Sequence, residues 1–126
     1  MEPNEALAEL LTLSSQIVDV AILGGSGFVL ASSGTPEQGE ELARIAAELL
    51  AAAADVRPGR DIARVEVGLE GGSVFVVTEG GRSAVARTVP EPTAGLVVYD
   101  LRTALHRLDE DQPVKPKARK KRDADA

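Results

Sequence analysis

Several residue types that carry specialised chemistry are missing or scarce. The sequence has no cysteine and no tryptophan, one histidine, and only three other aromatic residues. Without cysteine, the chain can form neither a disulfide framework nor a thiolate metal site. No apolar run approaches the roughly 18 residues of a membrane-spanning helix, and the acidic start MEPNEALAEL is unlike a secretory signal. These absences predict a cytoplasmic protein with no membrane span.

Catalytic and cofactor motifs are missing as well. The glycine cluster at 24–27 is not followed by Gly-Lys-Ser/Thr, and it joins two strand-like segments, so no helix N-terminus would face a phosphate. It also fails the nucleophile-elbow pattern, because Phe28 stands where the last glycine should be. The single histidine, His106, has only Asp109 and Glu110 nearby as ordinary solvated charges. We therefore predict no catalytic residue, no metal site, no cofactor and no enzymatic activity.

Charge divides the chain into two parts. Residues 1–112 carry 18 acidic and 8 basic side chains, a net charge of −10, whereas residues 113–126 carry 6 basic and 2 acidic ones, a net charge of +4. Every lysine lies in the second part: Lys115, Lys117, Lys120 and Lys121. We predict a folded domain over residues 1–112 and a disordered basic tail over residues 113–126.

Three roles are open for this tail. It can make weak, salt-sensitive contact with an anionic surface such as lipid headgroups or nucleic acid. It can contact the acidic body of the protein, or it can simply raise solubility. Because no aromatic residue is interleaved with its basic residues, stacking on bases is excluded.

The stretch from Thr35 to Asp55 predicts one long helix, with a capping box at Thr35 and Gln38 and proline at the first helical position. Apolar residues at helical spacing form a stripe: Leu42, Ile45, Ala46, Leu49 and Ala53. Charged residues line the opposite side: Glu37, Glu41, Arg44 and Glu48. A flat flank of alanines lies beside the stripe: Ala43, Ala47, Ala51 and Ala54. This flank reflects either helix propensity or a helix–helix contact with a second copy.

Shorter patterns surround this helix. Residues 4–14 predict a helix, and residues 16–23 and 28–32 predict a hairpin with a glycine-rich turn. Three strands should form a meander: residues 62–69, 73–78 and 82–89. Residues 93–108 predict a final helix, although the run Leu96-Val97-Val98 also fits a strand. Gly-Gly pairs at 24–25, 71–72 and 80–81 mark turns where positive φ is expected.

The order of these segments favours one five-stranded antiparallel sheet. The segments IVDVAIL and SVFVV are apolar on both faces, so helices should cover both sides of the sheet. We predict an α+β fold of the α/β/α sandwich type, with the long helix on one face and two helices on the other.

These residues resemble the Roadblock (dynein light chain) domain family. The resemblance rests on ILGGSGFVLASSG, on the glutamate-led long helix, on VEVGLEGGSVFVVTEGGRSAVARTV and on GLVVYDLRTAL, and it covers residues 5–108. It implies a Roadblock-like fold and a homodimer or heterodimer joined through the long helix and the third strand. The dimer interface is then expected to contain Ala43, Ala47, Ala51, Arg64 and Glu66.

Bacterial relatives of that family often act with small Ras-like GTPases, as scaffolds or as activators of GTP hydrolysis. The resemblance therefore implies a non-enzymatic homodimeric regulator or scaffold for such a GTPase. The expected partner-binding residues are Glu37, Glu41, Arg44 and Glu48. A merely solvated face is the alternative for each of them.

A second function class stays open, namely a small-ligand or nucleic-acid-binding sensor module of profilin-like architecture. A ligand sensor should contain an apolar cavity with some aromatic lining. The scarcity of aromatic residues and the many small residues instead predict a filled core with no ligand-sized cavity.

Overall fold

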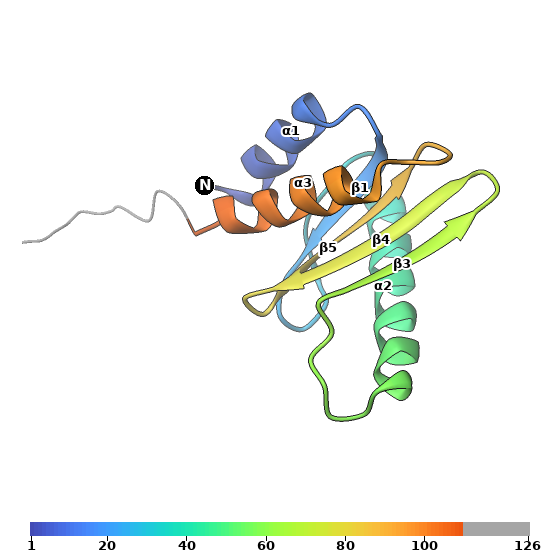
Figure 1. Ribbon diagram of the computed structural model, residues 1–126. Helices are drawn as coiled ribbons and strands as arrows, with labels where there is room; N and C mark the ends of the chain where they lie inside the picture. The colour runs from blue at the N-terminus through green and yellow to red at the C-terminus, as the bar shows by residue number, and fades with distance from the viewer. Residues whose placement is uncertain (110–126) are drawn as a thin grey trace, which may run out of the picture.

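The computed structural model describes residues 1–109. The chain forms α1 (Pro3–Leu13), β1 (Ile17–Leu23), β2 (Val29–Ser32), α2 (Pro36–Val56), β3 (Arg64–Leu69), β4 (Gly72–Glu79), β5 (Arg82–Thr88) and α3 (Ala94–Arg107) (Figure 1). Every predicted element is present, and Leu96–Val98 lies in α3, so the strand alternative is wrong. The predicted basic tail, residues 113–126, and the predicted domain end at residue 112 lie outside the described residues.

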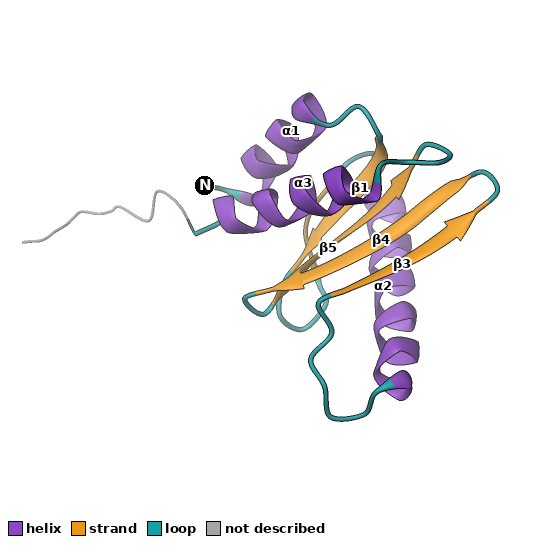
Figure 2. Cartoon of the chain, in the orientation of Figure 1, coloured by secondary structure: helices purple, strands orange, loops and turns teal. Residues whose placement is uncertain are grey.

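The strands form one five-stranded sheet in the order β2-β1-β5-β4-β3, and all neighbouring pairs are antiparallel. The predicted hairpin and meander are both confirmed. Figure 2 shows α1 and α3 on one face of the sheet and α2 on the other. The predicted three-layer α+β architecture is therefore correct.

Side chains of the central strands alternate between two core clusters, which explains why helices cover both faces of the sheet. In β4, Phe75 and Val77 enter the core cluster that contains α1 and α3 residues, whereas Val74 and Val76 enter the cluster that contains α2 residues. Side chains alternate between the two faces of a strand, so a strand that is apolar at every position needs cover on both sides. All four of these side chains are buried.

The start of α2 is fixed by the predicted capping box. The Gln38 amide donates to Thr35 Oγ1 at 3.2 Å, and the Thr35 amide donates to Gln38 Oε1 at 2.9 Å. Gly39 allows this first turn to lie against β2, because a Cβ there would come within 2.5 Å of Ser32 Oγ. Further along, Leu42 and Ala46 are fully buried, and the rest of the predicted stripe (Ile45, Leu49 and Ala53) is half-buried.

Glycine turns follow the prediction at two of the three Gly-Gly pairs. Gly72, Gly80 and Gly81 have positive φ. The prediction is wrong at Gly24-Gly25, because the positive φ of that turn falls at Gly27 instead. Gly72 is the most constrained of these three glycines. Its φ is 142°, and a Cβ there would lie only 2.1 Å from the carbonyl oxygen of Thr88.

We predict that Gly72→Ala destabilises the fold by at least about 2 kcal/mol, because the methyl group would overlap the β5 backbone in a conformation that L-residues rarely adopt. The neighbouring Gly71→Ala is the matched control, since a Cβ there meets no atom within 4 Å, and its effect should stay within about 0.5 kcal/mol. Urea denaturation of both variants measures the difference. Equal stability of the two variants would contradict this account of the β3–β4 turn.

Candidate functional site

The charged residues predicted for partner binding lie together on the solvent side of α2. Glu37, Glu41, Arg44 and Glu48 are all exposed. Arg44 Nη1 lies 3.2 Å from Glu48 Oε2, and the two side chains are 60% and 67% exposed. Such an exposed pair contributes little to stability. The face is therefore accessible to a partner, and its role in binding stays a prediction.

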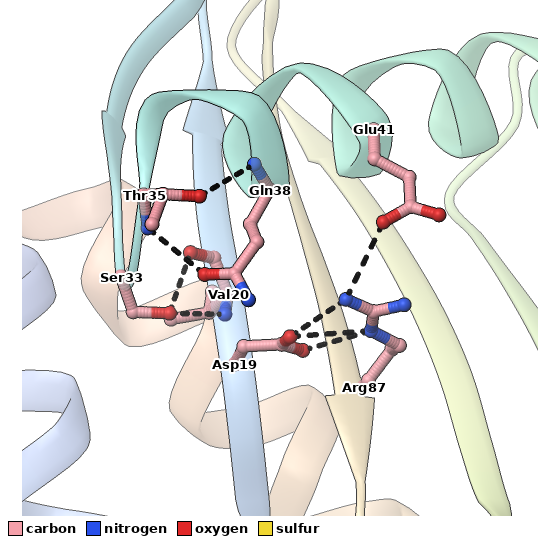
Figure 3. A network of polar contacts seen from close by, with 7 residues as sticks. All are labelled: Asp19, Val20, Ser33, Thr35, Gln38, Glu41 and Arg87. Carbon is pink, nitrogen blue, oxygen red and sulfur yellow. Dashed lines mark hydrogen bonds and ion pairs between the residues drawn. The ribbon is translucent and has the colours of Figure 1, made fainter.

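One member of this face is linked to the sheet through a polar network (Figure 3). Arg87 on β5 donates from Nε and Nη2 to both carboxylate oxygens of Asp19 on β1, at 2.8 to 3.2 Å. Arg87 Nη2 also lies 3.9 Å from Glu41 Oε1. The pKa of Arg87 is raised mainly by its hydrogen bond to Asp19, against the opposing effect of burial and with help from the charges of Asp19 and Glu41. Glu41 thus sits above a guanidinium that stays charged.

The same view shows how the entry to α2 is anchored on β1. Ser33 Oγ accepts from the Val20 amide at 2.9 Å, and the Ser33 amide donates to the Val20 carbonyl at 2.9 Å. These contacts extend the β1–β2 pairing to Ser33, two residues before the cap residue Thr35. Because the helix start is held at the sheet, the charged face of α2 has a defined orientation relative to the strands.

The alanine flank of α2 faces a hollow on the molecular surface. Ala43 is half-buried, while Ala47, Ala51 and Ala54 are exposed. Ala43 and Ala47 line a hollow of about 730 Å³, together with Leu50, the β1–β2 turn, the β4–β5 turn and residues 61–63. This hollow is open to the surface, so it is distinct from the cavity in the core that the sequence argues against. It forms because one helix leaves that end of the sheet uncovered.

The remaining predicted interface residues lie on β3, the edge strand beyond β4. Val65 packs in the cluster under α2, so by alternation Arg64 and Glu66 project from the opposite face of the sheet. Both are exposed. The structure therefore divides the predicted interface set between the two faces of the sheet, with the alanines on one face and the charged pair on the other.

Several features of the surface were not predicted from the sequence. Val56 at the end of α2 and Leu69 at the end of β3 are 75% and 61% exposed. A second hollow of about 370 Å³ lies beside Asp19, Leu69, Val74 and Arg87. Exposed valine and leucine next to predicted interface elements are a recognisable signal of contact surface, although the sequence does not reveal which apolar residues are exposed.

The partner of His106 is a residue that lies far from it in the sequence. Its Nε2 pairs with Glu79 Oε2 on β4, and Arg102 Nε lies 3.2 Å from the other oxygen of that carboxylate. Asp109 pairs instead with Arg82, at 2.6 Å. These contacts join α3 to the β4–β5 hairpin. They span from 23 to 27 residues of sequence, and no local pattern indicates them.

Within residues 1–109, no cluster of three or more histidine or carboxylate side chains could hold a metal ion. No helix in that part of the chain combines the length and the apolar character needed to cross a bilayer.

Solved structures share this arrangement. A Roadblock/LC7 domain from Streptomyces avermitilis matches with a TM-score of 0.72 at 21% identity, over 83% of this chain and 92% of that one. The chain has the fold of a Roadblock/LC7 domain. MglB from Myxococcus xanthus shares this Roadblock/LC7 fold, with a TM-score of 0.69 at 18% identity, over 85% of this chain and 84% of that one.

More distant similarity extends beyond Roadblock/LC7 domains. LokiProfilin2, solved in complex with rabbit actin, matches with a TM-score of 0.58 at 15% identity, over 85% of this chain and 96% of that one. No protein-family model matches the sequence, and no curated protein matches it. The three-dimensional arrangement is thus the feature that connects this chain to known proteins.

Proposed function

We propose that this chain is a non-enzymatic homodimeric regulator or scaffold for a small Ras-like GTPase, which binds on the charged face of α2. The observation that carries the proposal is the edge strand β3, which lies next to the exposed long helix of a Roadblock/LC7 fold. Within residues 1–109, no strand pairs with the outer side of β3. The likeness to MglB supports the proposal. The GTPase partner follows from the resemblance of the sequence to bacterial Roadblock domains.

The edge of β3 suits pairing with a second copy. An unpaired strand edge carries a row of free amide and carbonyl groups, and monomeric proteins commonly protect it with lysine or proline. β3 contains neither residue, and its last residue, Leu69, is exposed. Pairing two copies of β3 would satisfy these groups and would bring the two α2 helices to the same side of a continuous sheet.

Charge selects a register for that pairing. Arg64 and Glu66 lie on one face of β3, and neither has an ion-pair partner among residues 1–109. If a two-fold axis passes beside Val65, Arg64 of each protomer lies directly opposite Glu66 of the other. Opposite charges in facing positions stabilise a strand pair, and like charges destabilise it. We propose this register for the dimer.

The alanine flank supplies the second part of the proposed interface. Ala47 and Ala51 are exposed and small, so another backbone can approach this side of α2 closely. Ala52 offers a matched reference, because it is also exposed and lies about 140° around the helix axis from Ala47. The same substitution at Ala47 and at Ala52 therefore compares the two flanks of α2.

We expect the wild type to have twice the 13.1 kDa mass of one chain in size-exclusion chromatography with light scattering. Ala47→Glu should weaken the dimer by at least about 30-fold, because it buries an unpaired charge in the interface. Ala52→Glu should leave the dimer intact, and circular dichroism should show that both variants keep their helices. A dimer disrupted only by Ala52→Glu would move the interface to the other flank, and a monomeric wild type would refute the homodimer.

The β3 register has its own test. Glu66→Arg should weaken the dimer by about tenfold, because it places arginine opposite Arg64 of the other protomer. The double variant Arg64→Glu with Glu66→Arg should restore wild-type affinity, since both facing pairs are again of opposite charge. Analytical ultracentrifugation measures the three dissociation constants. A double variant as weak as the single one would exclude this register.

Binding of the proposed partner is tested with a small Ras-like GTPase from the same source. This GTPase is loaded either with a non-hydrolysable GTP analogue or with GDP. Glu48→Lys should weaken its binding by about tenfold, because the change reverses a charge on the proposed contact face. Glu5→Lys is the control, since Glu5 is exposed on α1 across the sheet. Calorimetry measures both affinities. Equal binding by wild type and Glu48→Lys would exclude this face, and the hydrolysis rate of the complex separates an activator from a scaffold.

A further inference from the structure

The hollow beside Leu69 owes its shape to a strand position that has no side chain. Val74 and Val76 of β4 pack toward α2, so by alternation Gly72 lies on the same face of the sheet. Glycine is required at that position by its φ of 142° and by the nearby carbonyl oxygen of Thr88. The turn geometry thus leaves a gap among the side chains at this end of the sheet, and the hollow of about 370 Å³ lies there.

Two exposed aliphatic side chains line opposite sides of this hollow. Leu69 on β3 is paired directly with Gly72, so no side chain of β4 lies beside it, and it is 61% exposed. Val18 is the extra residue of a bulge, because residues 17 and 19 of β1 pair with adjacent residues of β5. It is 62% exposed. Aliphatic side chains that stay exposed around a hollow are typical of a contact surface.

Three polar side chains that line the hollow are already paired within the fold. Arg87 and Asp19 bind each other through both carboxylate oxygens (Figure 3). The Thr88 hydroxyl accepts from the Ser73 amide at 3.1 Å and donates to a backbone carbonyl at 2.9 Å. A polar small molecule would gain little from these groups, whereas an apolar side chain would meet two aliphatic walls.

The surroundings of the hollow are acidic. Glu41 on α2 lies 3.9 Å from Arg87 Nη2. Glu70 follows Leu69 in the β3–β4 turn, is exposed, and has no ion-pair partner among residues 1–109. In the same part of the chain, Arg87 is the only basic residue that lines the hollow, and Asp19 offsets its charge. The two glutamates therefore leave a negative potential that favours basic groups on a partner.

We propose that this hollow binds a protein segment that presents one leucine-like side chain between lysine or arginine residues. The apolar side chain lies between Val18 and Leu69, and the basic residues lie at Glu41 and Glu70. Because Glu41 also belongs to the charged face of α2, the hollow adjoins that face. The inference goes beyond the proposed function, since it holds whether or not the partner is a GTPase. A second copy of this chain seated in the hollow is a different occupant, which the experiment below distinguishes.

Short peptides test both features of the proposed segment. The 15N-labelled full chain is titrated with three peptides capped at both ends, and its amide resonances are followed by NMR. The peptides are Lys-Arg-Leu-Arg-Lys, Lys-Arg-Ser-Arg-Lys and Glu-Asp-Leu-Asp-Glu. The first should bind at least about fivefold more tightly than the second, because leucine buries apolar surface that serine lacks, and the third should not bind, because like charges repel. The amide resonances of Val18, Leu69 and Gly72 should shift most.

Matched variants test the position of the site. Leu69→Ser and Val18→Ser should each weaken binding of the leucine peptide at least about fivefold, because each removes one apolar wall. Leu13→Ser is the control, since Leu13 is 66% exposed at the end of α1, and it should leave binding unchanged. Glu70→Gln should weaken binding about twofold through the loss of one attractive charge. Circular dichroism checks that every variant keeps its fold.

Three results would overturn the proposal. Equal affinity for the leucine and serine peptides would show attraction by charge alone. Equal binding by Leu69→Ser and Leu13→Ser, or resonance shifts confined to α1 and α3, would exclude this hollow as the site. A lower oligomeric mass of Leu69→Ser than of the wild type in light scattering would assign the hollow to a second copy of the chain.

Discussion

The structure depends on a sheet whose central strands are apolar on both faces. Val20 and Ile22 of β1 pack toward α1 and α3, while Ala21 and Leu23 of the same strand pack toward α2. Neither set can face water without a large loss of hydrophobic stabilisation. Two helical layers are therefore required, and the chain order assigns the single long helix to one of them.

That assignment leaves part of one face uncovered. Five strands at about 4.8 Å spacing make a sheet roughly 20 Å wide, whereas one helix with its side chains is about 10 Å across. The α1–α3 pair can cover such a face, but α2 alone cannot. The hollow beside Ala47 and the hollow beside Leu69 lie at opposite ends of the strands. The contact surfaces of this protein thus follow from the difference between its two helical layers.

Local patterns were enough to predict the fold but not the contacts that complete the site. The capping box of Thr35 and Gln38 and the alternation in β3 and β4 depend on neighbours a few residues apart, so they are readable from sequence. The Asp19–Arg87 pair joins residues 68 positions apart, and its existence depends on which strands become neighbours. The exposure of Leu69 and the hollow beside Ala47 depend on the angle at which α2 crosses the sheet, which no spacing encodes. The partner-binding and interface residues are located by the structure, and their roles remain predictions.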